Sequence, residues 1–402
     1  MTLRLRAALS LLLVLLALVS SQISASYVLF GLLAAGWLAL SAREGLVERL
    51  ASPLTALAGV FALLVLASAA FSRDPARSLK ALPGLSLFLL LPIAMDSIES
   101  FAKARAVVLA LAASGAAQAL AGFWQYSRGG DDIQSRIQGS LSHTMTFSGL
   151  IMVSGCLFLG FLLEERGRRR LLGLLCVVPF AALLLSFTRN AYVGTLLAIA
   201  AYLALRRPRW LLLLVPVLLL AFLLVPPGVQ DRIVSVVDLQ DETNRDRIAM
   251  VRAGGRMIAD HPIFGVGPEM VKPYYTLYRD EDAPRWRVPH LHNNALQIAA
   301  ASGLFAAAVY GALLVLFFAR TMSLILRETR PERAALWAGA FLSVAALTVA
   351  GFFEYNFGDT EVLLATLLVM AVPFSRGAAL STSDRPVGDG ARVRNPFEDR
   401  EN

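Results

Sequence analysis

The chain has 402 residues, of which 57% are hydrophobic and only 16% are charged, against about 25% charged residues in a typical soluble domain. This composition and a mean hydropathy of +0.62 exclude an ordinary soluble protein. The net charge of +8 does not indicate nucleic-acid binding, because most basic residues lie in short connections between apolar runs, as membrane topology requires. The two cysteines lie in or beside apolar segments, and they form neither a disulfide framework nor a zinc-binding spacing.

Apolar runs of about 20 residues recur along the chain, which is the length that a helix needs to cross a bilayer. The runs are continuous and do not alternate, so they predict an all-α polytopic membrane protein. The first run follows Arg4 and Arg6 and resembles a signal peptide, but a second apolar run comes at once and indicates an uncleaved span. We predict twelve spans, at residues 7–22, 25–41, 53–71, 79–95, 104–124, 144–163, 171–187, 190–205, 210–226, 294–319, 333–352 and 360–375.

The distribution of basic residues predicts the orientation of these spans. With the N-terminus inside, the inner connections carry 17 Lys and Arg residues and the short outer connections carry six. Cytoplasmic loops are the basic ones, so both termini are predicted to be cytoplasmic. We therefore divide the chain into nine spans over 1–226, a helical periplasmic cap over 227–293, three spans over 294–376 and a disordered cytoplasmic tail over 377–402.

The outer face collects all four histidines and several arginines, beginning with Arg136 and His143 just before the sixth predicted span. A helix N-terminus with polar neighbours favours an anion, although His143 fits a simple helix cap equally well. Arg189 joins two spans, and an arginine at a membrane boundary indicates a site because its planar fork binds phosphate in a bidentate manner. The alternative is that Arg189 extends to lipid headgroups.

Residues 241–260 are predicted to form a helix within the long outer loop, capped near Asp241 and ending before Pro262. Arg245, Arg252 and Arg256 share one face, which indicates a stripe facing solvent or headgroups. Arg247 lies on the opposite, apolar arc, where a guanidinium needs an anionic partner. The two candidates for that partner are a carboxylate, such as Asp359 or Glu354, and a substrate phosphate.

Residues 289–297 lead into a strongly apolar helix, with His292 and Asn293 at its first turn. A neutral imidazole there accepts a proton from a sugar hydroxyl near neutral pH, while the alternative is a capping histidine. A metal site at His290 and His292 is a competing hypothesis, which the lack of a carboxylate at ligand spacing disfavours. The turn-rich stretch 260–268 is too short for a dinucleotide fingerprint and is predicted to pack the cap on the membrane domain.

The motifs together resemble the O-antigen ligase family, within the superfamily that also holds O-antigen polymerases. The resemblance covers about residues 136–305 and comprises Arg136-x-x-Gly139 followed by His143, Ser186-Phe-Thr-Arg189, Arg247-x-x-x-x-Arg252-Ala, Asp260-His-Pro-Ile-Phe-Gly-Val-Gly-Pro268 and His292-Asn293-x-x-Leu-Gln297. The chain departs from the family pattern at Ala295 and Val251, where aromatic residues are frequent.

The resemblance implies a metal-independent and cofactor-independent glycosyltransferase at the periplasmic face of the inner membrane of a Gram-negative bacterium. It implies an undecaprenyl-pyrophosphate-linked glycan as donor, a sugar hydroxyl of lipid A-core as acceptor, and transfer with inversion. His292 would be the general base, and Arg189 and Arg247 would stabilise the leaving pyrophosphate. Further substrate contacts are predicted from Arg136, His143, His290, Asn293 and Arg252.

Four other functions compete with this interpretation. A polymerase of glycan repeats and a ligase acting on protein share the same superfamily motifs, although the short outer loop and tail favour the lipid A-core ligase. A transporter of lipid-linked saccharides would place charges near the bilayer midplane, where this chain has almost none. A purely structural membrane protein would give no reason for Arg247 on an apolar face.

Overall fold

The computed structural model describes residues 2–129, 136–236, 238 and 240–378. All regular elements in these ranges are helical, which confirms the all-α part of the predicted fold class. Within the same ranges, seven helices are long and apolar enough to cross a membrane. They are α2 (Ile23–Glu44), α4 (Pro53–Phe71), α8 (Phe101–Tyr126), α9 (Thr144–Glu164), α16 (Asn294–Arg327), α17 (Pro331–Ala350) and the stretch Thr360–Ala378, which begins with α18 (Thr360–Ala371).

The other five predicted spans also coincide with helical sequence, but none of them is among the helices that are both long and apolar enough to cross a membrane, so the count of twelve is not confirmed. Prolines explain one interruption, because Pro83 and Pro92 each lie in the first turn of a new short helix. The five regions hold α1 (Thr2–Leu18); α6 (Leu82–Ser86) with α7 (Leu90–Ser97); the 3₁₀ stretch Gly167–Cys176 with α10 (Val177–Leu185); α11 (Arg189–Arg206); and α12 (Leu211–Leu224). Short connecting helices are α3 (Leu46–Leu50) and α5 (Pro75–Ser78).

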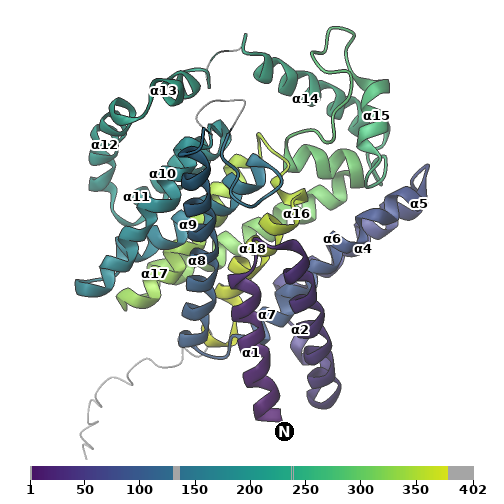
Figure 1. Ribbon diagram of the computed structural model, residues 1–402. Helices are drawn as coiled ribbons and strands as arrows, with labels where there is room; N and C mark the ends of the chain where they lie inside the picture. Colours follow the sequence, from purple (N-terminus) through teal and green to yellow (C-terminus); the bar gives the residue numbers. More distant parts are fainter. Residues whose placement is uncertain (1, 130–135, 237, 239, 379–402) are drawn as a thin grey trace, which may run out of the picture.

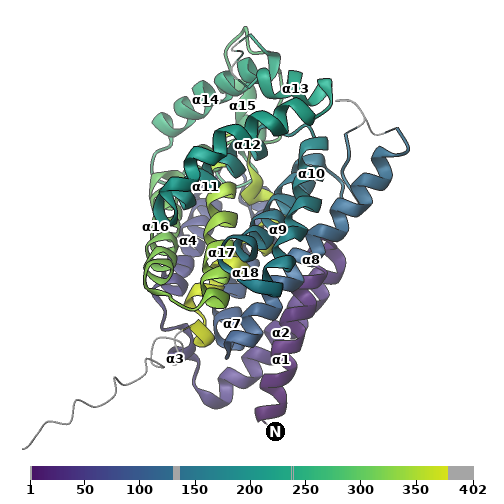
Figure 2. The ribbon, with the colours of Figure 1, turned by 90° about the vertical axis from the view of Figure 1, so that its left-hand side faces the viewer.

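The centre of the bundle is formed by α9 and α17, which pack along each other with α8 and α11 on either side (Figures 1 and 2). Every residue of α9 from Thr146 to Phe161 is buried, so this helix is enclosed by other helices on all faces. Small residues permit the close approach: a Cβ at Gly160 would lie 2.5 Å from the backbone of Gly339 in α17.

A layer of three helices lies across the end of the bundle opposite the N-terminus (Figures 1 and 2). It consists of α13 (Pro227–Val234), α14 (Glu242–Asp260) and α15 (Val271–Tyr278), and we call residues 227–293 the end layer. Met250, Met257 and Tyr275 are fully buried in its small core. The predicted helix 241–260 is confirmed, and the Asp241 side chain caps it by accepting hydrogen bonds from the backbone of Thr243 and Asn244.

The turn-rich stretch 260–268 attaches the end layer to α16, as predicted. The backbone N–H groups of Val266 and Gly267 donate to the carbonyls of Ala300 and Ala301. Helix α16 is kinked at Gly303, whose φ of 86° and contact with the Ile263 carbonyl leave no space for a side chain.

The two ends of the described chain meet at the opposite end of the bundle. Arg6 forms an ion pair with Glu99 at 2.8 Å, and the backbone N–H of Gly377 donates to the carbonyl of Ile98. The start of α1 and the end of α18 therefore lie far from the end layer (Figure 1). Apart from its first two residues, the predicted tail 377–402 lies outside the described residues.

Candidate active site

A cavity of about 180 Å³ lies between the end layer and the bundle. We call it the arginine cavity, because five guanidinium groups and one carboxylate belong to its lining. The structure brings together in it four of the predicted site residues, which come from well-separated stretches of the chain. The lining comprises Arg136, Met145, Phe187, Thr188, Arg189, Asn190, Arg232, Thr243, Asp246, Arg247, Arg285 and His292.

Arg189, the first residue of α11, is buried and binds the end layer directly. Its guanidinium donates to the Ser235 carbonyl at 2.7 Å, to Asn244 Oδ1 at 3.2 Å and to Asp241 Oδ1 at 2.9 Å. Burial raises the pKa of Asp241, but the hydrogen bond and charge of Arg189 outweigh it and hold the pKa below its usual range. The alternative of an arginine extended to lipid headgroups does not fit this buried ion pair.

Arg247 differs from Arg189, because it forms no ion pair or hydrogen bond with any other residue that the structure describes, and its buried Nε has no partner. The predicted ion pair with Glu354 or Asp359 is therefore absent from the described residues. Burial lowers the pKa of Arg247, and the charge of Glu354 opposes this only from a distance. A guanidinium that is desolvated without a partner is poised to accept an anion.

Several positively charged guanidinium groups lie close together in the arginine cavity. Burial lowers the pKa of Arg136 and lowers that of Arg232 to about 10, and the positive charge of Arg189 lowers both further. The guanidinium of Arg232 donates to the Phe187 carbonyl at 3.4 Å, and its contact with the carboxylate of Asp241 is longer, at 3.8 Å. On the other side of the cavity, Asp246 binds the half-exposed Arg285 at 3.1 Å. The cavity therefore has a surplus of positive charge that a bound anion would relieve.

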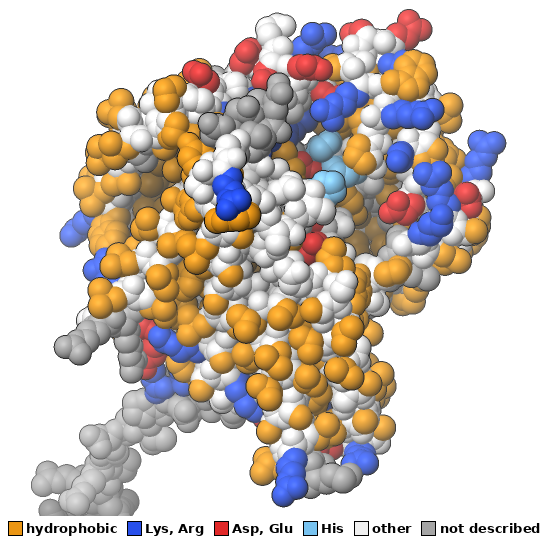
Figure 3. Space-filling model, viewed as in Figure 1, with side chains coloured by type: hydrophobic (Ala, Val, Ile, Leu, Met, Phe, Trp, Pro, Cys, Tyr) orange, Lys and Arg blue, Asp and Glu red, His pale blue; other side chains and the backbone are white. Residues whose placement is uncertain are grey.

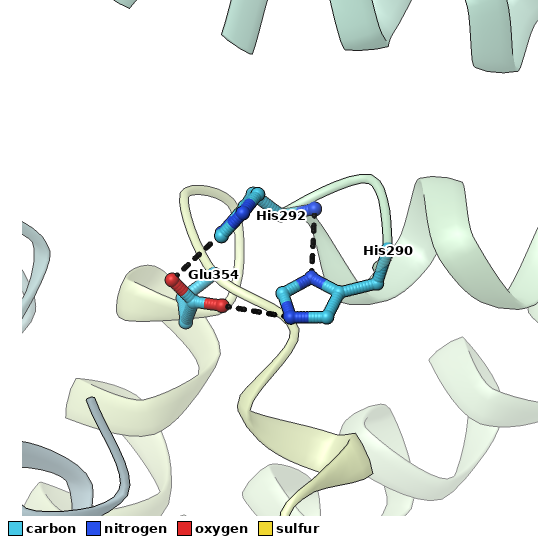
Figure 4. Close-up of side chains that lie close together, drawn as sticks. All are labelled: His290, His292 and Glu354. Atoms are coloured by element: carbon cyan, nitrogen blue, oxygen red, sulfur yellow. Dashed lines mark hydrogen bonds and ion pairs between the residues drawn. The ribbon is translucent and has the colours of Figure 1, made fainter. Parts of the chain in front are cut away.

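His292 is held by a carboxylate, as Figure 4 shows. Its Nδ1 lies 2.9 Å from Glu354 Oε2, while His290 Nε2 lies 3.7 Å from Glu354 Oε1. Burial raises the pKa of Glu354, but the hydrogen bond from His292 and the two imidazoles keep it below its usual range. Since the carboxylate accepts, Nδ1 of His292 carries the hydrogen, and Nε2 is the basic nitrogen. In the described part of the chain, that Nε2 has no hydrogen-bond partner.

The backbone supports this arrangement. His292 has a φ of 48°, in the left-handed region that residues other than glycine seldom adopt. Its backbone N–H lies 3.4 Å from Nδ1 of His290, so that nitrogen is the acceptor and Nε2 of His290 carries the hydrogen toward Glu354. Burial lowers the pKa of His290 to about 4, so its ring is neutral at neutral pH. Strain at a histidine is typical of functional sites.

The same three side chains also meet the geometric requirement of a metal site. The ligand atoms of His290, His292 and Glu354 all lie within 4.8 Å of one another. Sequence spacing offered no carboxylate near the two histidines, and the fold supplies one from 62 residues further along. The competing metal hypothesis is therefore stronger than the sequence indicated.

The remaining predicted residues do not line the arginine cavity. Asn293 caps α16 by accepting from the backbone N–H of Leu296, and its amide donates to the carbonyl of Phe352. His143 stands at the N-cap position of α9 without a side-chain capping bond. Arg252 is 62% exposed and lies 3.6 Å from Asp280, which fits the predicted solvent-facing stripe. Their predicted substrate contacts stay predictions.

Sequence reasoning missed Arg232 and Arg285 as members of the cavity, and it named Glu354 only as a candidate partner of Arg247. Arg232 follows Pro227 in a short amphipathic helix, and Arg285 lies in an irregular loop. Neither stands out by pattern, because their proximity to Arg189 and Arg247 arises only when the end layer packs on the bundle. The one available signal was the outer position shared by all these basic residues.

Comparison with known proteins identifies the middle of the chain. The family model described as O-antigen ligase matches residues 172–311, and no curated protein matches the chain. The matched segment contains Arg189, Arg247 and His292, together with Arg232 and Arg285 of the arginine cavity. Over this segment, in an all-helical protein with several membrane-length apolar helices, the chain is similar to the O-antigen ligase family.

Proposed function

We propose that the protein is an O-antigen ligase, which transfers a glycan from undecaprenyl pyrophosphate to a sugar hydroxyl of lipid A-core. The observation that carries this proposal is the arginine cavity, where Arg247, which has no ion-pair or hydrogen-bond partner among the described residues, and other crowded guanidinium groups adjoin an imidazole held by a carboxylate. A pyrophosphate diester presents several anionic oxygens, and planar guanidinium groups bind such oxygens in a bidentate manner.

The proposed reaction is one displacement. The acceptor hydroxyl loses its proton to Nε2 of His292 as its oxygen bonds to the anomeric carbon of the donor glycan. The bond from that carbon to the pyrophosphate oxygen breaks, and the electron pair leaves with undecaprenyl pyrophosphate. Attack opposite the leaving group inverts the anomeric configuration. The imidazolium that forms is stabilised by Glu354, to which Nδ1 is already bonded.

Arg247 and Arg232 are assigned to the pyrophosphate, whose negative charge grows as the glycosidic bond breaks. Electrostatic stabilisation in a site that excludes water is worth a few kcal/mol per group, or about 10²-fold or more in rate. Arg189 would share this role while it also holds the end layer through Asp241. Arg136 would contribute from the loop before α9. The energy source is the donor itself, because an outward-facing site has no supply of ATP.

We further propose that the end layer faces the periplasm and that both termini are cytoplasmic, with the protein in the inner membrane of a Gram-negative bacterium. The basic residues concentrate in the connections on the side of the termini. The division into spans over 1–226, a periplasmic cap over 227–293 and spans over 294–376 follows from this orientation. Twelve crossings require that the shorter helices α1, α10, α11, α12 and the α6–α7 region also traverse the bilayer.

The proposal is tested with purified protein in lipid nanodiscs, a lipid-linked glycan and lipid A-core, in the presence of a chelator. Glycan transfer without added metal or nucleotide is expected, and His292→Ala should abolish it while the protein stays folded in the membrane. Normal transfer by His292→Ala would end the assignment of the base. Loss of wild-type transfer on chelation would favour the metal hypothesis at His290, His292 and Glu354.

Gene deletion separates the ligase from its relatives in the superfamily. Deletion of a ligase should leave long glycan on the lipid carrier, whereas deletion of a polymerase would leave single repeats attached to the core. Transfer to a protein acceptor would instead identify a protein ligase. Transfer by the purified enzyme without an ion gradient would exclude a transporter.

A further inference from the structure

A second and larger cavity, of about 500 Å³, adjoins the arginine cavity. His290 belongs to its lining, His292 belongs to that of the arginine cavity, and the centroids of the two rings are 4.3 Å apart. Glu354 contacts both rings, so the two cavities meet at this one cluster. Figure 3 shows histidine side chains in a hollow of the surface, with basic side chains on both sides of it.

The lining of the larger cavity has the composition of a small-molecule site. Its volume falls within the range of ligand pockets, roughly 300–1,000 Å³, which are mostly apolar with a few polar groups. The rings of Phe61, Phe88 and Phe357 form one aromatic wall, with centroids 5.2 to 6.4 Å apart. Gln297 and Asp359 add polar groups. Aromatic faces with hydrogen-bonding groups beside them suit a saccharide.

Two lysines belong to the lining of the larger cavity. The chain has only three lysines among its 37 basic residues, and two of them, Lys80 and Lys272, line the larger cavity. The third, Lys103, pairs with Glu99 at 2.5 Å at the end of the bundle where the termini lie. Lys80 and Lys272 are exposed and form no ion pair within the described chain, although the carboxylate of Glu269 is also part of the lining.

We propose that the larger cavity binds the acceptor saccharide, and that Lys80 and Lys272 hold an anionic substituent, such as a phosphate, on that saccharide. This inference rests on the proposed function, because it places the acceptor on the His290 side of the cluster and the donor pyrophosphate on the arginine side. An acceptor hydroxyl reaching past His290 then meets His292 between the two substrates. The lysines act as point charges at the cavity mouth, where a flexible ammonium suits a variable anionic group.

The test is a binding measurement that needs no donor and no transfer. A phosphorylated core oligosaccharide and its dephosphorylated form are titrated against the protein in nanodiscs. The double variant Lys80→Ala/Lys272→Ala should weaken binding of the phosphorylated form roughly tenfold, the combined effect of two exposed charge-assisted contacts. It should leave binding of the dephosphorylated form unchanged. Lys103→Ala serves as the matched control and should bind both forms normally.

A second variant tests the cavity without changing charge. Gly84 lies in its lining, and a side chain there meets no atom within 4 Å. Gly84→Trp should therefore fill the cavity and block both oligosaccharides, whereas Gly59→Trp on α4, which has the same free space outside the cavity, should not. Equal affinity of wild type and the lysine double variant for the phosphorylated form would overturn the proposal, as would undiminished binding to Gly84→Trp. Either result leaves the transfer assay, and so the proposed function, unaffected.

Discussion

Replacing Glu354 with glutamine tests most directly how the neighbouring carboxylate affects His292. The carboxylate is almost completely buried and lies 2.9 Å from Nδ1 of His292, so the variant removes one negative charge with little change in shape. In the proposed reaction a positive charge develops on His292, and the carboxylate is its nearest counter-charge. A hydrogen bond to a charged group is worth about 1.5–3 kcal/mol, which corresponds to a loss of roughly 10- to 150-fold in kcat.

The assay is glycan transfer by purified protein in nanodiscs, with kcat and the KM for donor measured separately. Because Glu354 is not part of the arginine cavity lining, KM for the lipid-linked donor should not change. Glu361→Gln is a matched control, since this residue is equally buried and its carboxylate forms no hydrogen bond or ion pair with His290 or His292. A kcat for Glu354→Gln within twofold of wild type would refute the positioning role, and so would an equal loss in Glu361→Gln.

Three further variants or conditions have distinct expected results. Arg247→Ala should reduce transfer about 100-fold or more without lowering the melting temperature, because the half-buried guanidinium has no ion-pair or hydrogen-bond partner among the described residues; a normal rate would contradict its role. Arg189→Ala should reduce both transfer and the melting temperature, because Asp241 and Ser235 lose their partner; an unchanged melting temperature would contradict that attachment. Folded His290 has a pKa of about 4 against an ordinary 6.5, so the unfolded chain binds the extra proton between these values. Thermal stability should therefore fall as the pH drops from about 6.5 to about 4, and the fall should be smaller in His290→Gln; an equal fall in both proteins would contradict the assignment.

Sequence patterns predicted the parts of the site that carry a local signal. Arg189 interrupts two apolar runs, and Arg247 breaks the apolar arc of an amphipathic helix, so each is visible from its neighbours alone. His292 precedes a long apolar helix by two residues. Arg189 begins α11 and His292 lies just before α16, and both meet Arg247 of the end layer in one cavity.

Other features of the site give no signal in the local sequence, and they become visible only in the folded structure. Glu354 lies in a short turn after α17 and reaches the histidines only because α16 and α17 are adjacent. Arg232 and Arg285 join the cavity when the end layer packs on α11. The predicted ion pair of Arg247 failed for the same reason, since hydrogen bonding to His292 engages Glu354. The lengths of the helices in the predicted spans depended on prolines such as Pro83 and Pro92. Each of these prolines lies in the first turn of a new short helix within an apolar run.

The most direct measurement is a structure of the protein determined with undecaprenyl pyrophosphate bound. The diphosphate should occupy the arginine cavity, in contact with Arg189, Arg232 and Arg247 and beside His292. A diphosphate bound in the larger cavity, or on a surface away from these guanidinium groups, would contradict the proposed chemistry.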